Sequence, residues 1–584
     1  MVGYICKYTP IEVIEAFGEK PFMLESGFKS HERAEALLHS NVCSYVNGVL
    51  ENILETNIQE VVLTSCCDSV CRLYDVLKGR IQFVYILDLP SKKDPLAVEL
   101  FRKEIEEFIR SYQAFKKKSF DEKEFIKILE RKKEDGKNSQ YQPNNMDQKI
   151  AILGGRLEDE IIERIKSSCT HNIVDFTCTG QERTFSIKKE SDVLTDYAES
   201  LLNFTPCMRM AEDRDNLIDQ SFFGVIYNTV KFCDFYSFEY AQLKDKIDVP
   251  LLKIETDHTD AESGQILTRI DAFLESTGTK KSDARDARNT ASRITTFDTG
   301  ATQDPGKLAQ KSAKRDEGQK DRNLGYFAGV DCGSTTTNVV IIDDKEQIVS
   351  YETIPTGPKP VESASNCFQL ALKNAGLGEK DIAFITATGY GRVSIPFAHK
   401  IVTEITCHGK GAFFLDNSIR TVIDIGGQDS KVIRLDDRGK VSDFVMNDKC
   451  SAGTGRFLEV MSRTLGIPIN EMAEIYTPSN EDITITSMCT VFAESEVISL
   501  IAQNKDEKDI VYALNKSIAS KIVSLVDRIG RQSRYMMTGG VAKNKGVVKI
   551  IENRLQEPVV VPFEPEVVGA LGAALISLEQ SLEQ

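Results

Sequence analysis

One long polar tract constrains the fold of this chain more than any other feature of its sequence. Residues 277–324 are rich in Lys, Arg, Asp, Ser, Thr and Gln and contain few large apolar side chains. A segment of this composition cannot bury enough apolar surface to offset the conformational entropy that it would lose on ordering. We therefore expect a flexible linker at residues 277–324, with separately folded parts on either side of it.

The overall composition limits the classes of function. At 584 residues, the chain is long enough for three or four domains or lobes. Acidic residues outnumber basic ones by 88 to 72, which argues against general binding to nucleic acid or to an anionic membrane. No apolar run reaches the roughly 18 residues of a membrane helix and no targeting segment is evident, so we expect a cytoplasmic protein. In that compartment, the 14 cysteines are expected to be metal ligands or buried thiols rather than disulfides.

The region before the linker alternates apolar runs of strand length with amphipathic helical segments. This alternation predicts parallel α/β lobes of the Rossmann-like type. A second polar stretch, residues 131–148, divides the region into lobes at residues 1–148 and 149–276. A long surface loop within one domain would give the same composition.

Several of the predicted strands lead into a cysteine. Residues 61–63 lead to Cys66 and Cys67, residues 173–174 lead to Cys178, and residues 224–227 lead to Cys233. In open parallel sheets, ligands bind beyond the carboxyl ends of the strands, so these thiols are expected to converge. Cys43 and Cys207 lie in loop-like contexts and could join them. Burial is the alternative explanation for any single thiol. The candidate metal ligands of this region are Cys43, Cys67, Cys178, Cys207 and Cys233.

The region after the linker contains two similar glycine-rich hairpins. Residues 326–330 form a predicted strand that leads into Asp331, and residues 339–342 return as a second strand. Residues 421–429 repeat this arrangement around Asp424, and a third glycine-rich turn follows at residues 538–542.

Glycine lets the backbone approach phosphate groups, hydroxyl and N–H groups donate to the phosphate oxygens, and an acidic side chain can hold Mg2+ through water. We therefore expect two similar halves that close on one nucleotide, although the third turn alone could cap a helix. The predicted ATP contacts are Gly333, Ser334, Thr335, Thr336, Gly426, Gly427, Gly539 and Gly540.

Two further cysteines, Cys450 and Cys489, each precede a segment with helical apolar spacing, and we expect each of them to cap a helix. At a helix N-terminus, free N–H groups and the partial positive charge favour a thiolate or an anionic iron-sulfur cluster. Two thiolates supply only half of the usual ligands of a four-iron cluster, and a twofold dimer would supply the others. Ordinary burial is the alternative explanation for an isolated pair of cysteines.

The region after the linker resembles the activator ATPases of 2-hydroxyacyl-CoA dehydratases and the related ATPase subunits of benzoyl-CoA reductases. The likeness spans residues 325–578 and is carried by both hairpins, both cysteine segments and residues 387–392 and 537–542. It implies a fold like that of actin and the sugar kinases, and a homodimer with one ATP per subunit. It also implies a 4Fe-4S cluster that Cys450 and Cys489 of the two subunits hold between them.

The same resemblance implies roles for the acidic residues of the hairpins. Asp331 and Asp424 would organise Mg2+, and Gln428 or Asp429 would orient the attacking water, although Asp429 could instead act indirectly. We expect an electron donor such as ferredoxin or flavodoxin. The acceptor would lie in the N-terminal region or in an external dehydratase or reductase.

The region before the linker resembles the iron-sulfur subunits of the same dehydratases, and most closely their double-cubane cluster proteins. The segments that carry this likeness, within residues 9–274, are Cys43, the Cys67-Asp68 pair and residues 178–180, 206–208, 231–239, 255–257 and 264–270. The resemblance implies a second iron-sulfur cluster, which has six thiolates in the double-cubane type. Related sequences often carry a second cysteine two positions after the cysteine that corresponds to Cys207. This chain has Arg209 at that position. Cys66 could replace that ligand, or the site could hold one smaller cluster.

These features together predict an ATP-driven electron-transfer protein of α/β class, in which the C-terminal part delivers an electron to the N-terminal part. A small-molecule kinase on the same fold, a nucleotide-gated scaffold, and an acyl-CoA dehydratase or reductase acting through the N-terminal lobes remain alternatives. Residues 509–529 are expected to form a packing helix. Cys332 and Cys407 are expected to be buried thiols, and His408 a structural residue.

Overall fold

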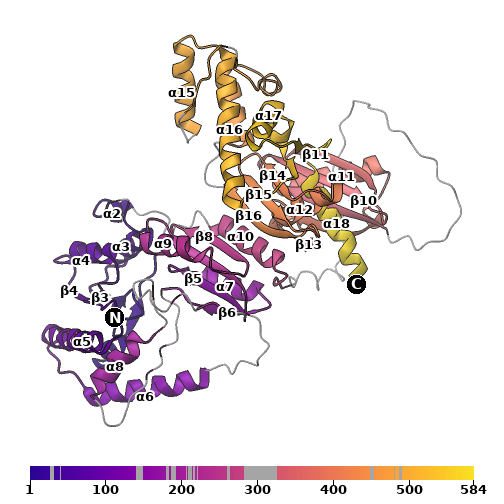
Figure 1. Ribbon diagram of the computed structural model, residues 1–584. Coiled ribbons are helices and arrows are strands. Elements are labelled where there is room, and N and C mark those ends of the chain that lie inside the picture. The colour runs from indigo at the N-terminus through magenta and orange to yellow at the C-terminus, as the bar shows by residue number, and fades with distance from the viewer. Residues whose placement is uncertain are drawn as a thin grey trace. The chain divides into compact units, whose positions relative to one another are not determined.

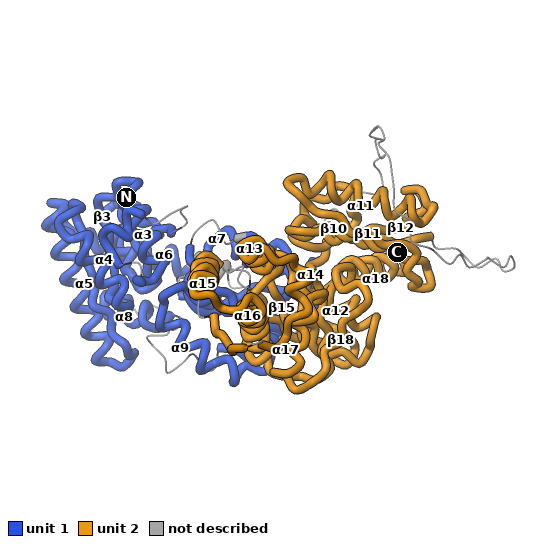
Figure 2. The backbone as a smooth tube through the Cα atoms, turned by 90° about the horizontal axis from the view of Figure 1, so that it is seen from above, with its two compact units in different colours: residues 1–281 blue, residues 282–584 orange. Residues whose placement is uncertain are grey.

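A computed structural model shows that the chain forms two compact units, residues 1–281 (unit 1) and residues 282–584 (unit 2) (Figures 1 and 2). The residues that the structure describes are 1–26, 32–39, 41–139, 149–178, 183, 185, 192–204, 207, 214, 217–219, 221–258, 263–281, 325–447, 453–478, 480–485 and 490–583. Residues 282–324 of the predicted linker therefore lie outside the described part. No helix within the described residues is long and apolar enough to cross a membrane.

Unit 1 contains two four-stranded sheets in which all strand pairs are parallel. The first sheet, in the order β2-β1-β3-β4, consists of β1 (Val2–Tyr4), β2 (Pro21–Met23), β3 (Glu60–Thr64) and β4 (Phe83–Leu87). The second sheet, in the order β6-β5-β7-β8, consists of β5 (Lys149–Gly154), β6 (Asn172–Asp175), β7 (Phe222–Val230) and β8 (Leu251–Thr256). Parallel pairing requires crossover connections, which helices provide here. The predicted α/β class with parallel sheets is thus confirmed.

The helices of unit 1 are α1 (Ile11–Ala16), α2 (Glu32–Glu35), α3 (Ser44–Thr56), α4 (Asp68–Leu77), α5 (Pro95–Lys116), α6 (Glu122–Ser139), α7 (Asp159–Ser168), α8 (Val193–Leu202), α9 (Asp234–Leu243) and α10 (Ser263–Ser276). Helix α8 follows the second strand of the second sheet but packs beside α5, as Figure 1 also shows. Its Tyr197 and Leu201 share one apolar core with Phe101 and Phe108 of α5. The chain therefore crosses between the two lobes more than once, and they share a core.

A buried carboxylate ties this shared core together. Glu12 of α1 is fully buried, and its oxygens lie 2.7 Å from Arg183 Nη2 and 2.9 Å from Lys132 Nζ. The Tyr197 hydroxyl donates to Glu12 at 2.7 Å. Although burial opposes it, Arg183 and Lys132 lower the pKa of Glu12 to about 2. The residue is therefore charged and fully paired.

Unit 2 contains two five-stranded sheets with the same strand order and directions. The first, in the order β11-β10-β9-β12-β13, consists of β9 (Tyr326–Cys332), β10 (Thr336–Ile342), β11 (Ile348–Pro355), β12 (Ile382–Thr388) and β13 (Lys400–Ile401). The second, in the order β16-β15-β14-β17-β18, consists of β14 (Thr421–Ile425), β15 (Ser430–Leu435), β16 (Val441–Asn447), β17 (Tyr535–Thr538) and β18 (Val559–Val560). Each sheet starts with an antiparallel meander and continues with two parallel strands. This duplication confirms the predicted actin/sugar-kinase-like fold of two similar halves.

The helices of unit 2 are α11 (Pro360–Ala375), α12 (Glu404–Leu415), α13 (Gly455–Leu465), α14 (Ile469–Met472), α15 (Thr490–Ala502), α16 (Glu507–Ile529), α17 (Lys545–Leu555) and α18 (Val568–Glu583), with short 3-10 turns η3 (Glu379–Asp381), η4 (Arg392–Ser394) and η5 (Gly540–Lys543). Helix α18 packs closely on both α12 and β9. A Cβ atom on Gly572 would lie 1.8 Å from Cys407 O, and one on Gly329 would lie 1.9 Å from Ala570 O. Glycine at these positions therefore permits the close packing of the two halves.

Helix α16 is the predicted packing helix of residues 509–529. Its buried side chains include Ile510, Leu514, Ile518, Ile522, Leu525, Val526 and Ile529, which confirms the prediction. Figure 1 shows that α15 lies alongside the end of α16 that extends away from the sheets. The pair therefore projects beyond the two sheets of unit 2.

Candidate functional site

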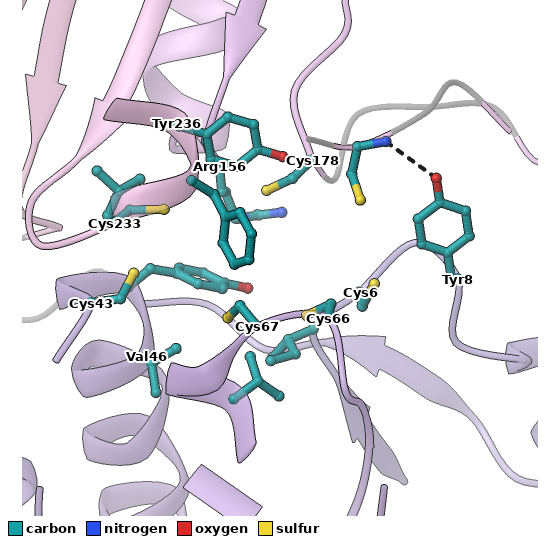
Figure 3. A pocket seen from close by; sticks show the side chains of 17 residues that line it. Cys6, Tyr8, Cys43, Val46, Cys66, Cys67, Arg156, Cys178, Cys233 and Tyr236 are labelled. Atoms are coloured by element: carbon teal, nitrogen blue, oxygen red, sulfur yellow. Dashed lines mark hydrogen bonds between the residues drawn. The ribbon is translucent and has the colours of Figure 1, made fainter. Parts of the chain in front are cut away.

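A cavity in unit 1 lies where loops from its two sheets face each other (Figure 3). The seven cysteines that line it are Cys6, Cys43, Cys66, Cys67, Cys178, Cys207 and Cys233. The unfilled space measures about 730 Å3, part of it open to solvent. Aromatic side chains and Arg156 complete much of the lining. All five cysteines predicted from the sequence thus come together, and Cys6 and Cys66 join them.

Three of these cysteines occupy the position immediately before a helix. Cys43 is the N-cap of α3, Cys67 that of α4, and Cys233 that of α9. The N–H group of Ser44 donates to Lys231 O at 3.1 Å, which joins the start of α3 to the turn before α9. Three helix N-termini, each with a partial positive charge, therefore lie at this group of cysteines and favour an anionic ligand.

Contacts among the thiols lower the pKa at three positions, Cys6, Cys67 and Cys233. The Cys43 thiol, with two first-turn amides of α9, lowers the pKa of Cys233 to about 7 although burial opposes it. The Cys66 thiol similarly lowers the pKa of Cys6 to about 6. Iron and zinc bind thiolates rather than thiols. The same contacts raise the pKa values of Cys43 and Cys66, and burial raises the pKa of Cys178 to about 12. In the empty cavity, thiolates are therefore favoured at Cys6, Cys67 and Cys233.

The other cysteines follow strands or lie in loops. Cys6 follows β1, Cys66 follows β3 and Cys178 follows β6. The N–H group of Cys207 donates to the Tyr8 hydroxyl at 3.3 Å, as the dashed line in Figure 3 marks. Within this second group, only Cys66 adjoins a helix start among the described elements, because it precedes Cys67, the N-cap of α4. Its surroundings therefore differ from those of the helix-capping cysteines.

The arrangement fits a polynuclear metal group rather than a single ion. Among the described residues, no set of three His, Cys, Asp or Glu side chains is placed to hold one metal ion. The seven thiols instead surround a cavity, and thiolates are the usual ligands of iron-sulfur clusters. The donor set of unit 1 therefore fits an iron-sulfur cluster.

In unit 2, the two predicted hairpins have the same turn. The Gly333 N–H donates to Thr336 O at 3.0 Å between β9 and β10. The Gly426 N–H donates to Asp429 O at 3.0 Å between β14 and β15. The likeness between the two halves thus extends to the hydrogen bond that closes each turn.

The two turns also approach each other closely. A Cβ atom on Gly427 would lie 1.9 Å from Thr335 Oγ1, so any larger residue at this position would displace the opposite turn. Ser334, Thr335 and Gln428 are exposed at the tips. Hydroxyl, amide and backbone N–H groups from both halves are therefore available to one ligand, as the oxygens of a polyphosphate require.

An acidic side chain lies in the first strand of each hairpin. Asp331 and Asp424 are 7% and 3% exposed. Thr538 Oγ1 donates to Asp424 Oδ1 at 2.9 Å, and His408 Nδ1 lies 3.6 Å from the same oxygen. Burial raises the pKa of Asp331 to about 6. Although burial opposes it, His408 and Lys431 hold the pKa of Asp424 below its usual value.

Lys431 lies among three carboxylates. Its Nζ is 2.8 Å from Asp429 Oδ2, 3.4 Å from Asp424 Oδ2 and 4.0 Å from Glu404 Oε1. These carboxylates raise the pKa of Lys431 although burial opposes them, so the ammonium group stays charged. Arg392 Nη1 lies 3.4 Å from the other Glu404 oxygen. The carboxylates outnumber the cations here, and this excess of negative charge suits a divalent cation.

The third glycine-rich turn follows β17, next to β14 in the sheet. Gly539 has a φ of +81°, and a Cβ atom there would lie 2.4 Å from Ile425 O and 2.8 Å from Asp424 Oδ1. A Cβ on Gly540 would lie 3.1 Å from Glu566 Oε1. Glycine at residue 539 therefore holds this turn against the end of the strand that carries Asp424, so the predicted nucleotide contacts of the second half lie side by side.

Cys450 and Cys489, the predicted ligands of a shared cluster, lie outside the described residues. The expectation that Cys450 caps the following helix is wrong, because α13 begins at Gly455 with Thr454 as its N-cap. Gly453 has a φ of +103°, which no right-handed helix accommodates. Helix α15 begins at Thr490, directly after Cys489 in the sequence.

Sequence reasoning missed four residues of these two sites, Cys6, Glu404, His408 and Lys431. Only Lys431 had a usable signal, because it lies two positions after Asp429 and alternate strand residues share a face. His408 was expected to be structural, and the structure places it beside Asp424. Cys332 and Cys407 are fully buried, which confirms their expected role.

Comparisons with known proteins agree with this division. Residues 328–577 match the BadF/BadG/BcrA/BcrD ATPase family, and residues 6–142 and 137–277 match the D-component of 2-hydroxyglutaryl-CoA dehydratase. The 2-hydroxyisocaproyl-CoA dehydratase activator of Clostridioides difficile is 42% identical over 44% of this chain and 97% of its own length. The activator of lactoyl-CoA dehydratase of Anaerotignum propionicum is 45% identical over 44% of this chain and 98% of its own. The (R)-2-hydroxyglutaryl-CoA dehydratase activating ATPase of Acidaminococcus fermentans is 41% identical over 44% and 98%, respectively.

Proposed function

Because this chain belongs to the BadF/BadG/BcrA/BcrD ATPase family and also carries a dehydratase D-component region, we propose that it couples ATP hydrolysis to low-potential electron transfer from unit 2 to unit 1. The observation that carries the proposal is the cavity lined by seven cysteines, in the same chain as two nucleotide-binding hairpins. Iron-sulfur clusters would supply the one-electron chemistry. In each cycle unit 1 gains the electron that unit 2 loses, ATP and water become ADP and phosphate, and a ferredoxin or flavodoxin restores the electron.

Unit 2 holds and hydrolyses the nucleotide in this proposal. Backbone N–H groups of the two hairpin turns bind the phosphates, and Asp331 and Asp424 hold Mg2+ directly or through water. Gln428 is exposed at the tip of its turn and orients the attacking water. Asp429 is instead paired with Lys431 at 2.8 Å, which favours an indirect role for it. The adenosine lies against the turn at residues 539–540.

Unit 1 receives the electron through the cysteines of its cavity. Cys43, Cys67 and Cys233, at three helix N-termini, and Cys178 and Cys207, which also line the cavity, would hold an iron-sulfur cluster that supplies the one-electron chemistry. Positive helix ends stabilise the added negative charge when the cluster is reduced. The two groups of thiols support a double-cubane type of cluster over one small cluster. An external dehydratase or reductase would then take the electron from unit 1.

A dimer would complete the ligand set of Cys450 and Cys489. Helix α15, which follows Cys489, exposes Val491, Phe492, Ile498 and Ile501, with exposed fractions of 66%, 68%, 53% and 41%. An apolar face of this kind at a helix usually marks a protein interface. Its place directly after a proposed cluster ligand supports a second copy of this chain as the partner. A Phe492→Glu variant should therefore sediment as a monomer and lose the iron bound by unit 2.

Anaerobic electron paramagnetic resonance of the full chain tests the proposal. The protein is reconstituted with iron and sulfide, reduced, and mixed with MgATP or with a non-hydrolysable analogue. We expect a new signal from unit 1 that depends on ATP and disappears in Cys450→Ser. Iron bound in unit 1 that stays oxidised under all conditions would contradict electron transfer. A phosphorylated small molecule formed without bound iron would instead favour the kinase alternative.

A further inference from the structure

His408 lies beside the acidic side chains of the nucleotide site, and the proposed hydrolysis of ATP assigns it no part. It is 5% exposed and belongs to α12, the helix that follows the last strand of the first sheet and precedes the first strand of the second. Glu404 lies four positions earlier on the same helix, so the two side chains share one face. Glu404 reaches Lys431 and His408 reaches Asp424. One face of α12 therefore meets the charged groups of this site.

The hydrogen bonds at His408 have a fixed direction. The Thr538 hydroxyl donates to Asp424 Oδ1 at 2.9 Å, and its oxygen lies 3.1 Å from His408 Nδ1. Lys431 Nζ, 3.4 Å from the other oxygen of Asp424, keeps that carboxylate ionised, so it can only accept. The single hydroxyl hydrogen of Thr538 is therefore used, and His408 Nδ1–H has to donate to the Thr538 oxygen. In the neutral ring, which a divalent cation nearby favours by repelling a second positive charge, Nε2 is then an acceptor.

The acceptor nitrogen lies next to the acidic residue of the other half. A Cβ atom on Gly569 of α18 would lie 2.9 Å from His408 Nε2 and 2.5 Å from Asp331 Oδ2. Both atoms therefore lie against the start of α18, and any residue larger than glycine would displace them. Among the described residues, Nε2 has no hydrogen-bonding partner. Two acceptor atoms repel each other at short range unless a hydrogen lies between them, and a water molecule that donates to both provides one.

We propose that His408 is a positioning residue for the Mg2+ of the nucleotide site, whose Nε2 accepts a hydrogen bond from a water of the ion and whose Nδ1–H fixes Asp424 through Thr538. The proposal rests on the proposed hydrolysis of ATP by unit 2. The ring bonds to Thr538 of the second half and adjoins Asp331 of the first, so it holds both acidic residues in one arrangement. Groups that orient metal ligands from behind raise the affinity for the metal.

Binding of Mn2+, a paramagnetic substitute for Mg2+, tests the role of Nε2 without measuring activity. The electron paramagnetic resonance signal of free Mn2+ at room temperature reports binding to the reconstituted full chain, with and without a non-hydrolysable ATP analogue. His408→Asn keeps an N–H at the position of Nδ1 but has no atom at that of Nε2. We expect the analogue-dependent affinity for Mn2+ to fall about tenfold. His408→Gln places an amide oxygen near the position of Nε2 and should recover part of this loss.

Two further variants complete the experiment. His399→Asn is the matched control, because the His399 ring accepts from the Ile385 N–H at 2.9 Å and packs against Phe384; it should bind Mn2+ as the parent chain does. Gly569→Ala leaves the ring of His408 unchanged but adds a methyl group against it, and it should also lower the affinity. This variant tests the same contact if thermal melting shows that His408→Asn does not fold.

The dependence of ATP hydrolysis on Mg2+ separates positioning from packing. In His408→Asn, the apparent KM for Mg2+ should rise by the same factor as the Kd for Mn2+, and kcat should recover at saturating Mg2+. A kcat that stays low at saturating Mg2+ in a folded variant would make His408 a packing residue and overturn the proposal. Parent-like affinity for Mn2+ in both His408→Asn and Gly569→Ala would overturn it as well. A parent chain that binds no additional Mn2+ with the analogue would instead overturn the proposed nucleotide site of unit 2.

Discussion

Buried charge has the opposite sign at the two candidate sites. In unit 2, the carboxylates of Asp331, Asp424, Asp429 and Glu404 outnumber the permanent cations of Lys431 and Arg392. In unit 1, Arg156 lines a cavity whose other lining groups are thiols, aromatic rings and aliphatic side chains, and Lys7 is buried next to Cys6, which also lines it. The carboxylates of unit 2 are nevertheless held in place by Lys431, whereas Lys7 has no hydrogen-bond acceptor among the described residues. The nucleotide site is thus largely preorganised, while the cysteine site depends more on its ligand.

This difference has a physical basis in the two ligands. ATP and Mg2+ bind and leave in each cycle, so their site has to keep its shape when empty, and the Lys431 ion pairs provide that stability. An iron-sulfur cluster stays bound, so the fold can leave its site incomplete and gain the missing stabilisation from the cluster. The thiolates and sulfides of a cluster would also supply the negative charge that Lys7 lacks.

Iron removal should produce the largest difference in stability between the two units. We expect anaerobic chelation to destabilise unit 1 by at least about 5 kcal/mol, because the free energy of cluster binding is part of its folding free energy. Hydrogen exchange measured by mass spectrometry should show lost protection in the first turns of α3, α4 and α9. Strands β9 and β14 of unit 2 serve as the internal control and should keep their protection. Equal protection of unit 1 with and without iron would mean that its site is also preorganised.

Loss of a carboxylate should disable unit 2 without affecting unit 1. Asp424→Ala removes a proposed Mg2+ ligand and should lower ATP turnover by about 10^3-fold, or roughly 4 kcal/mol of transition-state stabilisation. The iron content of unit 1 should not change. Asp437→Ala, which removes an almost fully exposed carboxylate, is the matched control. ATP hydrolysis by Asp424→Ala at the rate of the control would show that Mg2+ is held elsewhere.

Removal of the central cation tests the preorganisation of the nucleotide site. Lys431→Met leaves Asp424, Asp429 and Glu404 without their shared partner, and breaking a buried ion pair costs about 3 kcal/mol or more. We expect unit 2 to melt several degrees lower in calorimetry and Mg2+ to reverse part of this loss. Lys410→Met, which removes a partly exposed ion pair with Glu579, should have little effect. A loss of stability that Mg2+ does not relieve would contradict an excess of negative charge at this site.

The features that could be predicted from the sequence depend on local geometry. The hairpins were predictable because a tight turn between two apolar strands is encoded within a few residues, as at Gly333 and Gly426. Convergence of Cys67, Cys178 and Cys233 followed from the rule that ligands bind at the carboxyl ends of parallel strands. Strand β1, in contrast, is only three residues long, too short to produce an apolar run, so Cys6 gave no signal.

The remaining features arise from contacts between distant segments. Glu404 and His408 reach the nucleotide site because α12 packs against α18 and the second sheet, and no local pattern encodes that packing. The same holds for α8, which lies in sequence between strands β6 and β7 of the second sheet but joins the core of the first lobe. The helix start expected at Cys450 was wrong because apolar spacing does not reveal the positive φ of Gly453. The roles of Cys450 and Cys489 stay predictions.

The smallest predicted effect uses the proton as a competitor for Mg2+ in unit 2. Burial raises the pKa of Asp331 to about 6, so this carboxyl group becomes neutral as the pH falls through that value. The affinity for a magnesium nucleotide should then drop about tenfold between pH 7 and pH 5, because one proton is displaced per Mg2+ bound.

The stability of the empty site should change in the opposite direction. A carboxyl group with a raised pKa destabilises the folded state when ionised, so protonation between pH 7 and pH 5 should stabilise unit 2 without nucleotide. The charged groups that act on Asp331 are His408, Glu404, Asp424 and Lys431. The pKa values of the last three are shifted away from this window, and Asp331→Asn leaves His408 in place, so a trend that persists in this variant belongs to another group. Calorimetric titration with MgATP analogues and thermal melting across this pH range check both signs, with Asp331→Asn as the variant that should show neither trend. If binding and stability both weakened on acidification, a group other than Asp331 would control the site, and its excess of negative charge would not be what holds the metal.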